Sequence, residues 1–356
     1  MITNPAFQLI LIMSLESSSP MRILLSQTGD LSDCILTLPV ACSLKEYFPN
    51  AEIAIAVGVE KADFLEQHSA IDEVVELPIR WNRSPRGIRS VKQELTAQNF
   101  DVAIDCDESF VSALVCQLSA AARRIGWDTM PRFAPRRRLL NELVTPVFHH
   151  VVDRRLELLA PLAIDRPQAN FDWPVESADH RWAMRYRHRW AGQDLAIMDS
   201  GRVSSSVGWM FDRYAATARY LADRFQMHSI VTWRTFEERL KAEQIVACAG
   251  DAASLAPDMT LSLSAALSPL ARVVIAEDTP MLHAAAAAGA KVVGLYGPTD
   301  GAESSSARGP YQQHALAIET NSRGGSPRGE AINRIGVEHV CQWIDQLQTP
   351  AFAEAA

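Results

Sequence analysis

The chain has 356 residues, of which 48% are apolar, and its formal net charge is −8 at pH 7. This length suits two ordinary domains better than one, and the acidic balance argues against a general nucleic-acid-binding protein. No apolar stretch is long enough to span a bilayer. Residues 1–20 precede the first clear strand and are expected to be either a disordered extension or an artefact of an upstream start codon. The apolar "FQLILIM" within them lacks the basic region that opens a signal peptide.

Short β-rich runs alternate with helical patterns along the chain. The runs are continuously apolar rather than alternating, which is typical of parallel strands covered by helices on both faces. Strands are predicted at residues 22–27, 52–58, 72–78, 101–106, 194–200, 229–233, 272–278 and 291–297. Helices are predicted at 34–47, 212–225, 236–249 and 281–289, among others. This alternation predicts an α/β fold of two doubly wound, Rossmann-like domains.

The polar, proline-bearing segment 166–179 predicts the join between these domains. We therefore expect an N-terminal domain over residues 21–170 and a C-terminal domain over residues 171–356. Doubly wound domains bind their ligands beyond the carboxyl ends of the strands. The two domains are thus expected to face each other across a central cleft that holds the ligand.

The stretch "SQTGDLSDCILTLP" (26–39) places two acids, Asp30 and Asp33, where a strand leads into a helix. Aspartate is a favoured helix N-cap, so either residue, or neither, fits that role. A carboxylate at such a turn can also take a proton from a bound substrate. The residues alone leave both interpretations open.

A second informative segment is "VVIAEDTPMLHAAAAAGAKVVGLYGPTD" (273–300). A buried strand ends before Asp278, and Thr279 and the following proline start a helix. Unpaired N–H groups and the helix dipole make such a start an anion site that suits a nucleotide diphosphate. In the alternative interpretation, Asp278 and Thr279 only cap the helix, and His283 is a buried histidine with satisfied hydrogen bonds.

Residues 80–138 form a basic segment, with eleven Lys and Arg residues against six acids, in an otherwise acidic protein. Arg83, Arg86 and Arg89 recur at every third position, so they would line up on a helix, although "SPRG" fits a loop equally well. The segment is either a solvated surface or a site for phosphates and carboxylates, which arginine binds bidentately. It would also be attracted to an anionic membrane.

The strand with "GDLSDCILTLP", the later "DTPMLHAAAAAG" and the following "YGPTD" together resemble the ADP-heptose:lipopolysaccharide heptosyltransferases (glycosyltransferase family 9). These are inverting glycosyltransferases of the GT-B fold. "HHVVDRRLELLAPLAI" (149–164) and "GWMFDRYAATARYL" (208–221) are similar to the family at the expected intervals. The similarity runs from Met21 to Gln348. It implies an enzyme that moves a heptose, or a similar sugar, from an ADP-activated donor to a lipopolysaccharide inner-core-type acceptor.

The resemblance also implies the roles of individual residues. Asp33 matches the family's general base. The residues expected to contact the donor are Asp278, Thr279, His283, Gly297, Pro298 and Thr299. The arginines expected to contact the acceptor are Arg83, Arg86 and Arg123. No cofactor and no metal are implied, and the six cysteines form no metal-ligand spacing.

This chain departs from the family pattern at four positions. The family usually has a basic residue at Gln27, glycine at Ser32, the lysine that neutralises the diphosphate at Val207, and glycine at Pro280. Without compensation, the lost lysine would slow transfer by roughly two to three powers of ten. We expect hydrogen bonds from Arg202, Ser204 and Ser205 to compensate.

The expected partners are a nucleotide-sugar donor of the ADP-heptose type and an anionic glycolipid acceptor, with no nucleic acid. The expected location is cytoplasmic, with peripheral contact at the inner membrane. Two alternatives remain open: a relative with a different donor, and a non-catalytic relative that binds a nucleotide or glycan.

Overall fold

The computed structural model describes residues 20–58, 63–129, 131, 134–201, 208–297, 304–311, 315–319 and 332–348. The chain divides into two compact units after Asp172, inside the polar segment 166–179. Among the described residues, no helix combines the length and the apolar character needed to cross a membrane.

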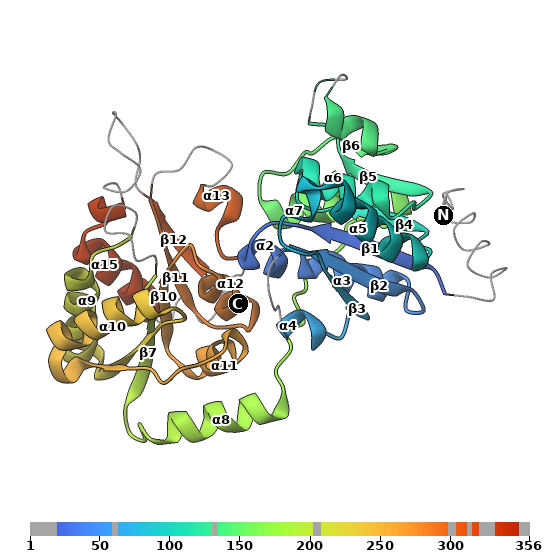
Figure 1. Cartoon of the computed structure of the whole chain (residues 1–356). Coiled ribbons are helices and arrows are strands. Elements are labelled where there is room, and N and C mark those ends of the chain that lie inside the picture. Colours follow the sequence, from blue (N-terminus) through green and yellow to red (C-terminus); the bar gives the residue numbers. More distant parts are fainter. Residues whose placement is uncertain are drawn as a thin grey trace, which may run out of the picture. The chain divides into compact units, whose positions relative to one another are not determined.

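The N-terminal unit is built on a sheet whose neighbouring strands are all parallel (Figure 1). Its strands are β1 (Arg22–Gln27), β2 (Glu52–Val57), β3 (Glu73–Glu76), β4 (Val102–Asp105), β5 (Arg123–Trp127) and β6 (Glu142–Val144). Its helices are α2 (Leu31–Ile35), α3 (Leu38–Tyr47), α4 (Asp63–Glu66), α5 (Pro85–Ala97), α6 (Phe110–Leu118) and α7 (Val151–Glu157), with 3₁₀ turns η1 (Trp81–Arg83), η2 (Pro135–Leu139) and η3 (Ala160–Leu162). The strand order is β3-β2-β1-β4-β5-β6.

The C-terminal unit also contains a parallel sheet. Its strands are β7 (Asp194–Asp199), β8 (Met227–Thr232), β9 (Ala253–Leu255), β10 (Val273–Glu277), β11 (Val292–Tyr296) and β12 (Ala315–Glu319). Its helices are α8 (Ser177–His188), α9 (Phe211–Phe225), α10 (Phe236–Ala249), α11 (Leu261–Leu267), α12 (Pro280–Ala287), α13 (Ser305–Arg308) and α15 (Val337–Gln348), with 3₁₀ turns η4 (Gly250–Ala252), η5 (Ser268–Leu270) and η7 (Ile332–Arg334). The order β9-β8-β7-β10-β11-β12 repeats the topology of the first sheet.

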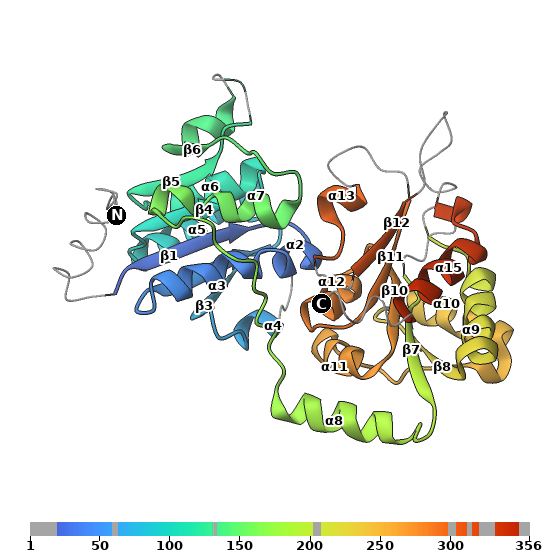
Figure 2. The ribbon, with the colours of Figure 1, turned by 180° about the vertical axis from the view of Figure 1, so that it is seen from behind.

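Helices cover both faces of the C-terminal sheet, which explains why its strands are continuously apolar. Figures 1 and 2 show α9, α10 and α15 on one face and α11 and α12 on the other. Along β7, Ala196 and Met198 enter the core on the first face, and Leu195 and Ile197 enter the core on the second. Successive side chains of a strand point to opposite faces, so burial of both faces requires an apolar residue at every position.

The strand order reverses once in each sheet, between β1 and β4 and between β7 and β10. The connections that leave these neighbouring strands turn away from each other, and in open α/β sheets this switch point is where ligands bind. The segments that follow β1, β4, β7 and β10 are therefore the places to look for a site.

The single helix expected at 34–47 is two helices, α2 and α3. Pro39 lies in the first turn of α3 and has no N–H to continue the hydrogen-bond pattern of α2, so the chain breaks at Leu36 and Thr37. Four strands were not predicted. Of these, β6, β9 and β12 lie at sheet edges, and β5 begins with two arginines.

Candidate active site

The two acids at the start of α2 have different partners. Asp30 is the N-cap, because its carboxylate accepts the backbone N–H of Asp33 at 3.0 Å. The Asp33 side chain is therefore not the cap. Its Oδ1 accepts a hydrogen bond of 2.7 Å from Nη2 of Arg155, which lies on α7. The capping role left open by the sequence belongs to Asp30.

Arg155 is 3% exposed and is held on three sides. Besides the Asp33 carboxylate, its guanidinium donates to the backbone oxygens of Asp33 and Cys106, each at 3.0 Å. It thereby joins α7 to α2 and to the residue that follows β4. A buried carboxylate and guanidinium in this geometry hold each other in one orientation. A Cβ at Gly29 would lie 2.6 Å from Asp33 Oδ2, so only glycine allows the carboxylate this close to the turn.

A second carboxylate, that of Asp107, approaches the same glycine from the end of β4. The same Cβ would lie 3.0 Å from Asp107 Oδ1, and Asp107 Oδ2 accepts a hydrogen bond of 2.6 Å from the Thr28 hydroxyl. Burial raises the pKa of Asp107 and the charge of Asp33 adds to the rise, while hydrogen bonds from Thr28 and Ser109 oppose it. Two acids thus meet at the switch point of the N-terminal sheet.

The basic segment 80–138 is partly used inside the fold. Arg136 is buried and donates twice to Asp105 Oδ2, at 2.8 and 3.1 Å. Arg123 lies at the amino-terminal start of β5, where it forms a fork with Glu142 at 2.6 and 2.7 Å. The structure therefore places Arg123 at the opposite edge of the sheet from Asp33.

The arginines that follow β3 are exposed. Ser84 caps α5, so Arg83 lies in η1 before the helix, and Arg86 and Arg89 lie in its first turns. The sequence left open whether these arginines lie on a helix or in a loop. The segment is a turn followed by the start of a helix. Because β1 and β3 are parallel members of one sheet, Arg83 and Arg86 lie at the same edge as Asp33.

In the C-terminal unit, a buried aspartate links the two sides of the switch point. Asp199 ends β7, and its Oδ2 accepts a hydrogen bond of 2.7 Å from the Thr279 hydroxyl at the start of α12. Its Oδ1 accepts a bond of 3.2 Å from Thr232. Thr279 has the extended backbone of an N-cap, but its hydroxyl makes no capping bond. Burial raises the pKa of Asp199 to about 6, against opposing hydrogen bonds.

His283 pairs with Asp278 within the segment after β10. Its Nε2 lies 2.9 Å from Asp278 Oδ1, and its imidazole is fully buried. Its Nδ1 has no hydrogen-bond partner among the described residues. Among the described residues, only one ring nitrogen of His283 therefore has a partner. Gly297 follows β11, the neighbour of β10, so it lies at the same sheet edge.

A buried cation lies beside these residues. Lys241 reaches from α10 to Glu277 Oε1 at 3.2 Å, and its side chain is 10% exposed. The same oxygen accepts the Trp209 backbone N–H at 3.0 Å and the Tyr214 hydroxyl at 3.2 Å. Burial raises the pKa of Glu277, and the Lys241 charge opposes that rise. The carboxyl edge of β10 therefore carries a lysine, although the family's lysine position holds Val207.

Six positions discussed above lie outside the described residues: Arg202, Ser204, Ser205, Val207, Pro298 and Thr299. Within the described part of the chain, no cluster of three or more His, Cys, Asp or Glu side chains is arranged to hold a metal ion.

The sequence analysis did not identify four residues at the carboxyl edges of the two sheets. Asp107 and Asp199 lie at or just after the ends of predicted strands, as Asp278 does, so comparing all strand ends would have found them. Arg155 and Lys241 lie on helices and reach the edges through tertiary packing. Nothing in their local sequence distinguishes them from other basic helix residues.

A family model described as glycosyltransferase family 9 (heptosyltransferase) matches residues 88–333. Lipopolysaccharide heptosyltransferase 1 of Salmonella typhimurium is 26% identical over 299 residues, which are 79% of this chain and 89% of that protein.

Two solved structures show the same fold. A glycosyl transferase family 9 protein from Veillonella parvula superposes with a TM-score of 0.77 at 18% identity, covering 93% of this chain and 98% of that one. E. coli heptosyltransferase WaaC with ADP-2-deoxy-2-fluoro heptose has a TM-score of 0.71 at 21% identity, covering 92% and 99%. With its two parallel α/β units, the fold is GT-B, which confirms the expectation from the sequence.

We predict that Arg155→Met lowers the free energy of unfolding by about 3–5 kcal/mol, because Asp33 then keeps a buried charge without its partner. The neighbouring Arg154→Met is the control. Its ion pair with Glu108 is partly exposed, at 25% and 31%, so we expect about 1 kcal/mol or less. Urea unfolding of both variants measures the difference, and equal losses would contradict the assignment.

Asp199 predicts a specific pH dependence of stability. Its folded pKa of about 6 lies above the ordinary 3.8, so its favourable contribution is present below pH ~4 and is lost as pH rises through ~6. This loss amounts to about 3 kcal/mol. Asparagine does not ionise, so Asp199→Asn does not lose this stability as pH rises. The variant should therefore gain stability relative to the natural protein between pH 4 and 7. Urea midpoints across this range test the prediction, and a difference that does not change with pH would refute it.

Proposed function

The chain belongs to glycosyltransferase family 9, the heptosyltransferases, and we propose that it moves a heptose, or a similar sugar, from an ADP-activated donor to a lipopolysaccharide inner-core-type acceptor. The relatives named lipopolysaccharide heptosyltransferase 1 and the WaaC structure with an ADP-heptose analogue support this choice of substrates. The observation that carries the proposal is the Asp33 carboxylate, held by buried Arg155 at the switch point of the N-terminal sheet.

Asp33 is the general base of the proposed reaction. Asp30 takes the helix cap, and Arg155 binds one carboxylate oxygen and sets the plane of the carboxylate. Asp33 accepts the proton of an acceptor hydroxyl while that oxygen forms a bond to the anomeric carbon of the donor. The bond from that carbon to the diphosphate oxygen breaks on the opposite face, so the configuration inverts and ADP leaves with the electron pair.

The donor is bound by the edge where β10 and β11 end. The first turn of α12 presents N–H groups and the positive end of a helix dipole to the diphosphate. Asp199 turns the Thr279 hydroxyl away from the cap. His283 Nε2 lies 2.9 Å from Asp278 Oδ1, and these two residues belong to the proposed donor contacts of this edge. Gly297 allows the chain to pass close to the nucleotide.

Lys241 and Arg155 supply cations where the family pattern is altered. The family's basic residue is replaced by Gln27, whose amide donates to Thr37 at 3.0 Å, and Arg155 provides the positive charge beside Asp33. Lys241 provides a second positive charge, beside Glu277, in the unit that is proposed to bind the donor. Arg202, Ser204, Ser205, Pro298 and Thr299 complete the proposed donor contacts.

The acceptor is proposed to bind the exposed arginines after β3. Arg83 and Arg86 lie at the same sheet edge as Asp33 and suit phosphates and carboxylates of a glycolipid. Arg123, which binds Glu142 at the other edge, is left out of this set. Because the acceptor is a membrane lipid, we place the enzyme in the cytoplasm with peripheral contact to the inner membrane.

Thermal unfolding with nucleotides distinguishes the proposed donor from a different one. ADP at about 100 times its dissociation constant should stabilise the folded protein by about 3 kcal/mol, which appears as a rise in unfolding temperature. UDP and GDP at the same concentration should give a much smaller rise. A larger rise with another nucleotide would identify a relative with a different donor.

Asp33→Asn should lower the rate of sugar transfer by about 10²–10⁴-fold, because an amide cannot accept the proton. ADP binding should be unchanged. Asp30→Asn is the matched control, since asparagine is also a good N-cap, and it should transfer within a few-fold of the natural rate. Transfer by Asp33→Asn at the natural rate would remove Asp33 as the base. ADP binding without transfer by the natural protein would favour the non-catalytic relative.

A further inference from the structure

Helix α8 and the residue after it are strongly basic in an acidic chain. Residues 177–189 contain four arginines, at 181, 185, 187 and 189, against the single acid Asp179. The whole chain has a net charge of −8, so this helix is a local reversal of sign. A local reversal of this kind gives a protein one face that an anionic surface attracts.

The cations lie on one exposed side of the helix. Ala183 and Tyr186 are buried in the core that α8 forms with α11 and α12. From Arg181 onward, the exposed positions are Arg181, Met184, Arg185, His188 and Arg189. Spacings of three and four residues place them on a continuous stripe, which runs for about 12 Å along the helix axis.

Three of these arginines have no ion pair within the described part of the chain: Arg181, Arg185 and Arg189. The contrast is with Arg187, which faces Asp194 at 4.0 Å and donates to the Trp190 carbonyl at 2.9 Å. The stripe therefore carries positive charge that the fold itself does not neutralise.

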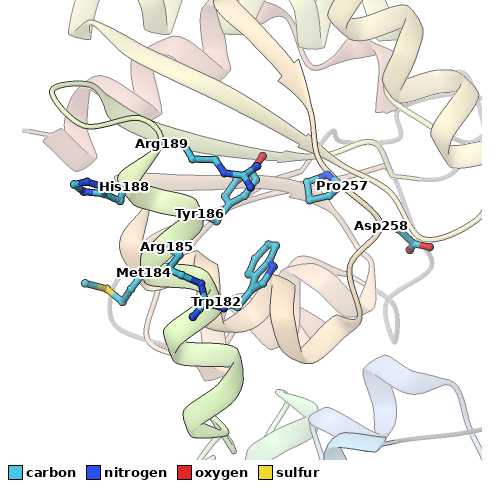
Figure 3. A pocket seen from close by; sticks show the side chains of 8 residues that line it. All are labelled: Trp182, Met184, Arg185, Tyr186, His188, Arg189, Pro257 and Asp258. Carbon is cyan, nitrogen blue, oxygen red and sulfur yellow. The ribbon is translucent and has the colours of Figure 1, made fainter.

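A hollow of about 720 Å³ adjoins the stripe, between α8 and the segment before α11 (Figure 3). Its walls include Trp182 and Tyr186, whose rings stack with centroids 5.1 Å apart. Figure 3 shows the Arg189 side chain beside Tyr186, with Met184 and His188 directed away from Pro257. One acid, Asp258, belongs to the lining.

These side chains match the chemistry of a lipid headgroup layer. Guanidinium groups bind phosphates, and the apolar stems of arginines lie along apolar surface. Tryptophan is enriched at the membrane interface because one part of its ring is apolar and another is polar. Met184, which is 48% exposed, adds an apolar side chain to the same face.

We propose that the exposed face of α8 docks on an anionic phospholipid surface, with Arg181, Arg185 and Arg189 binding headgroup phosphates. The proposal rests on the proposed function, from which it takes a membrane-embedded acceptor. It places the membrane contact on α8 rather than on the basic segment 80–138, where Arg123 and Arg136 pair with acids of the fold and the exposed Arg83 and Arg86 are proposed to bind the acceptor.

Co-sedimentation with vesicles that contain neither donor nor acceptor tests the proposal. The full chain should bind vesicles of phosphatidylglycerol and phosphatidylethanolamine, bind phosphatidylcholine vesicles weakly, and lose affinity as salt rises. Reversal of the three α8 charges (R181E/R185E/R189E) should weaken binding to the anionic vesicles by roughly 100-fold or more. The control R83E/R86E/R89E makes the same change of net charge on the N-terminal unit and should stay within about 3-fold.

Equal losses in the two triple variants, loss in the control alone, or no binding by the natural protein would overturn the proposal. Met184→Asp is a second, single substitution at an exposed position, and it should weaken vesicle binding by about 3-fold or more as it brings an acid to the surface. Transfer to a detergent-dispersed acceptor should be unchanged in R181E/R185E/R189E. Vesicle binding is measured without substrates, so failure of the transferase proposal would appear in the transfer assay alone.

Discussion

The strand order of each sheet reverses beside its first strand, and the positions of the polar side chains at the carboxyl ends of the strands depend on this reversal. At this point the connections to left and right diverge, and the carboxyl ends of two neighbouring strands stay accessible to polar side chains. Both units use it in the same way. A threonine hydroxyl donates to an aspartate across the switch, from Thr28 to the partly buried Asp107 at 2.6 Å and from Thr279 to the buried Asp199 at 2.7 Å. Burial raises the pKa of both acids.

Buried ion pairs hold the remaining charged groups in place at these edges. Removing a carboxylate from water is costly unless a well-placed cation and further hydrogen bonds compensate. Arg155 supplies three such bonds around Asp33 and Cys106, and Lys241 shares Glu277 with two other donors. Such ion pairs fix the orientation of the side chains more than they add net stability. Proton transfer and stabilisation of a leaving group both depend on side chains that are already oriented.

Both cations also bear on the departures from the family pattern. The basic residue expected at Gln27 and the lysine expected at Val207 are absent from the sequence. A positive charge nevertheless lies beside Asp33 and another lies at the end of β10, each carried by a helix side chain. Electrostatic stabilisation depends on where a charge lies rather than on which residue carries it.

The local sequence was sufficient for eight strands, the doubly wound class and the acids at two strand ends, because burial on both faces of a sheet requires apolar runs and polar residues mark where those runs stop. The local sequence did not predict β6, β9 and β12, which lie at the edges of the sheets. It also did not predict β5, which begins with Arg123 and Arg124. Only the tertiary structure assigned the cap to Asp30 and brought Arg155 to Asp33, 122 residues away. Periodicity records which face of an element is buried, whereas the partner of a buried charge depends on which distant helix packs against it.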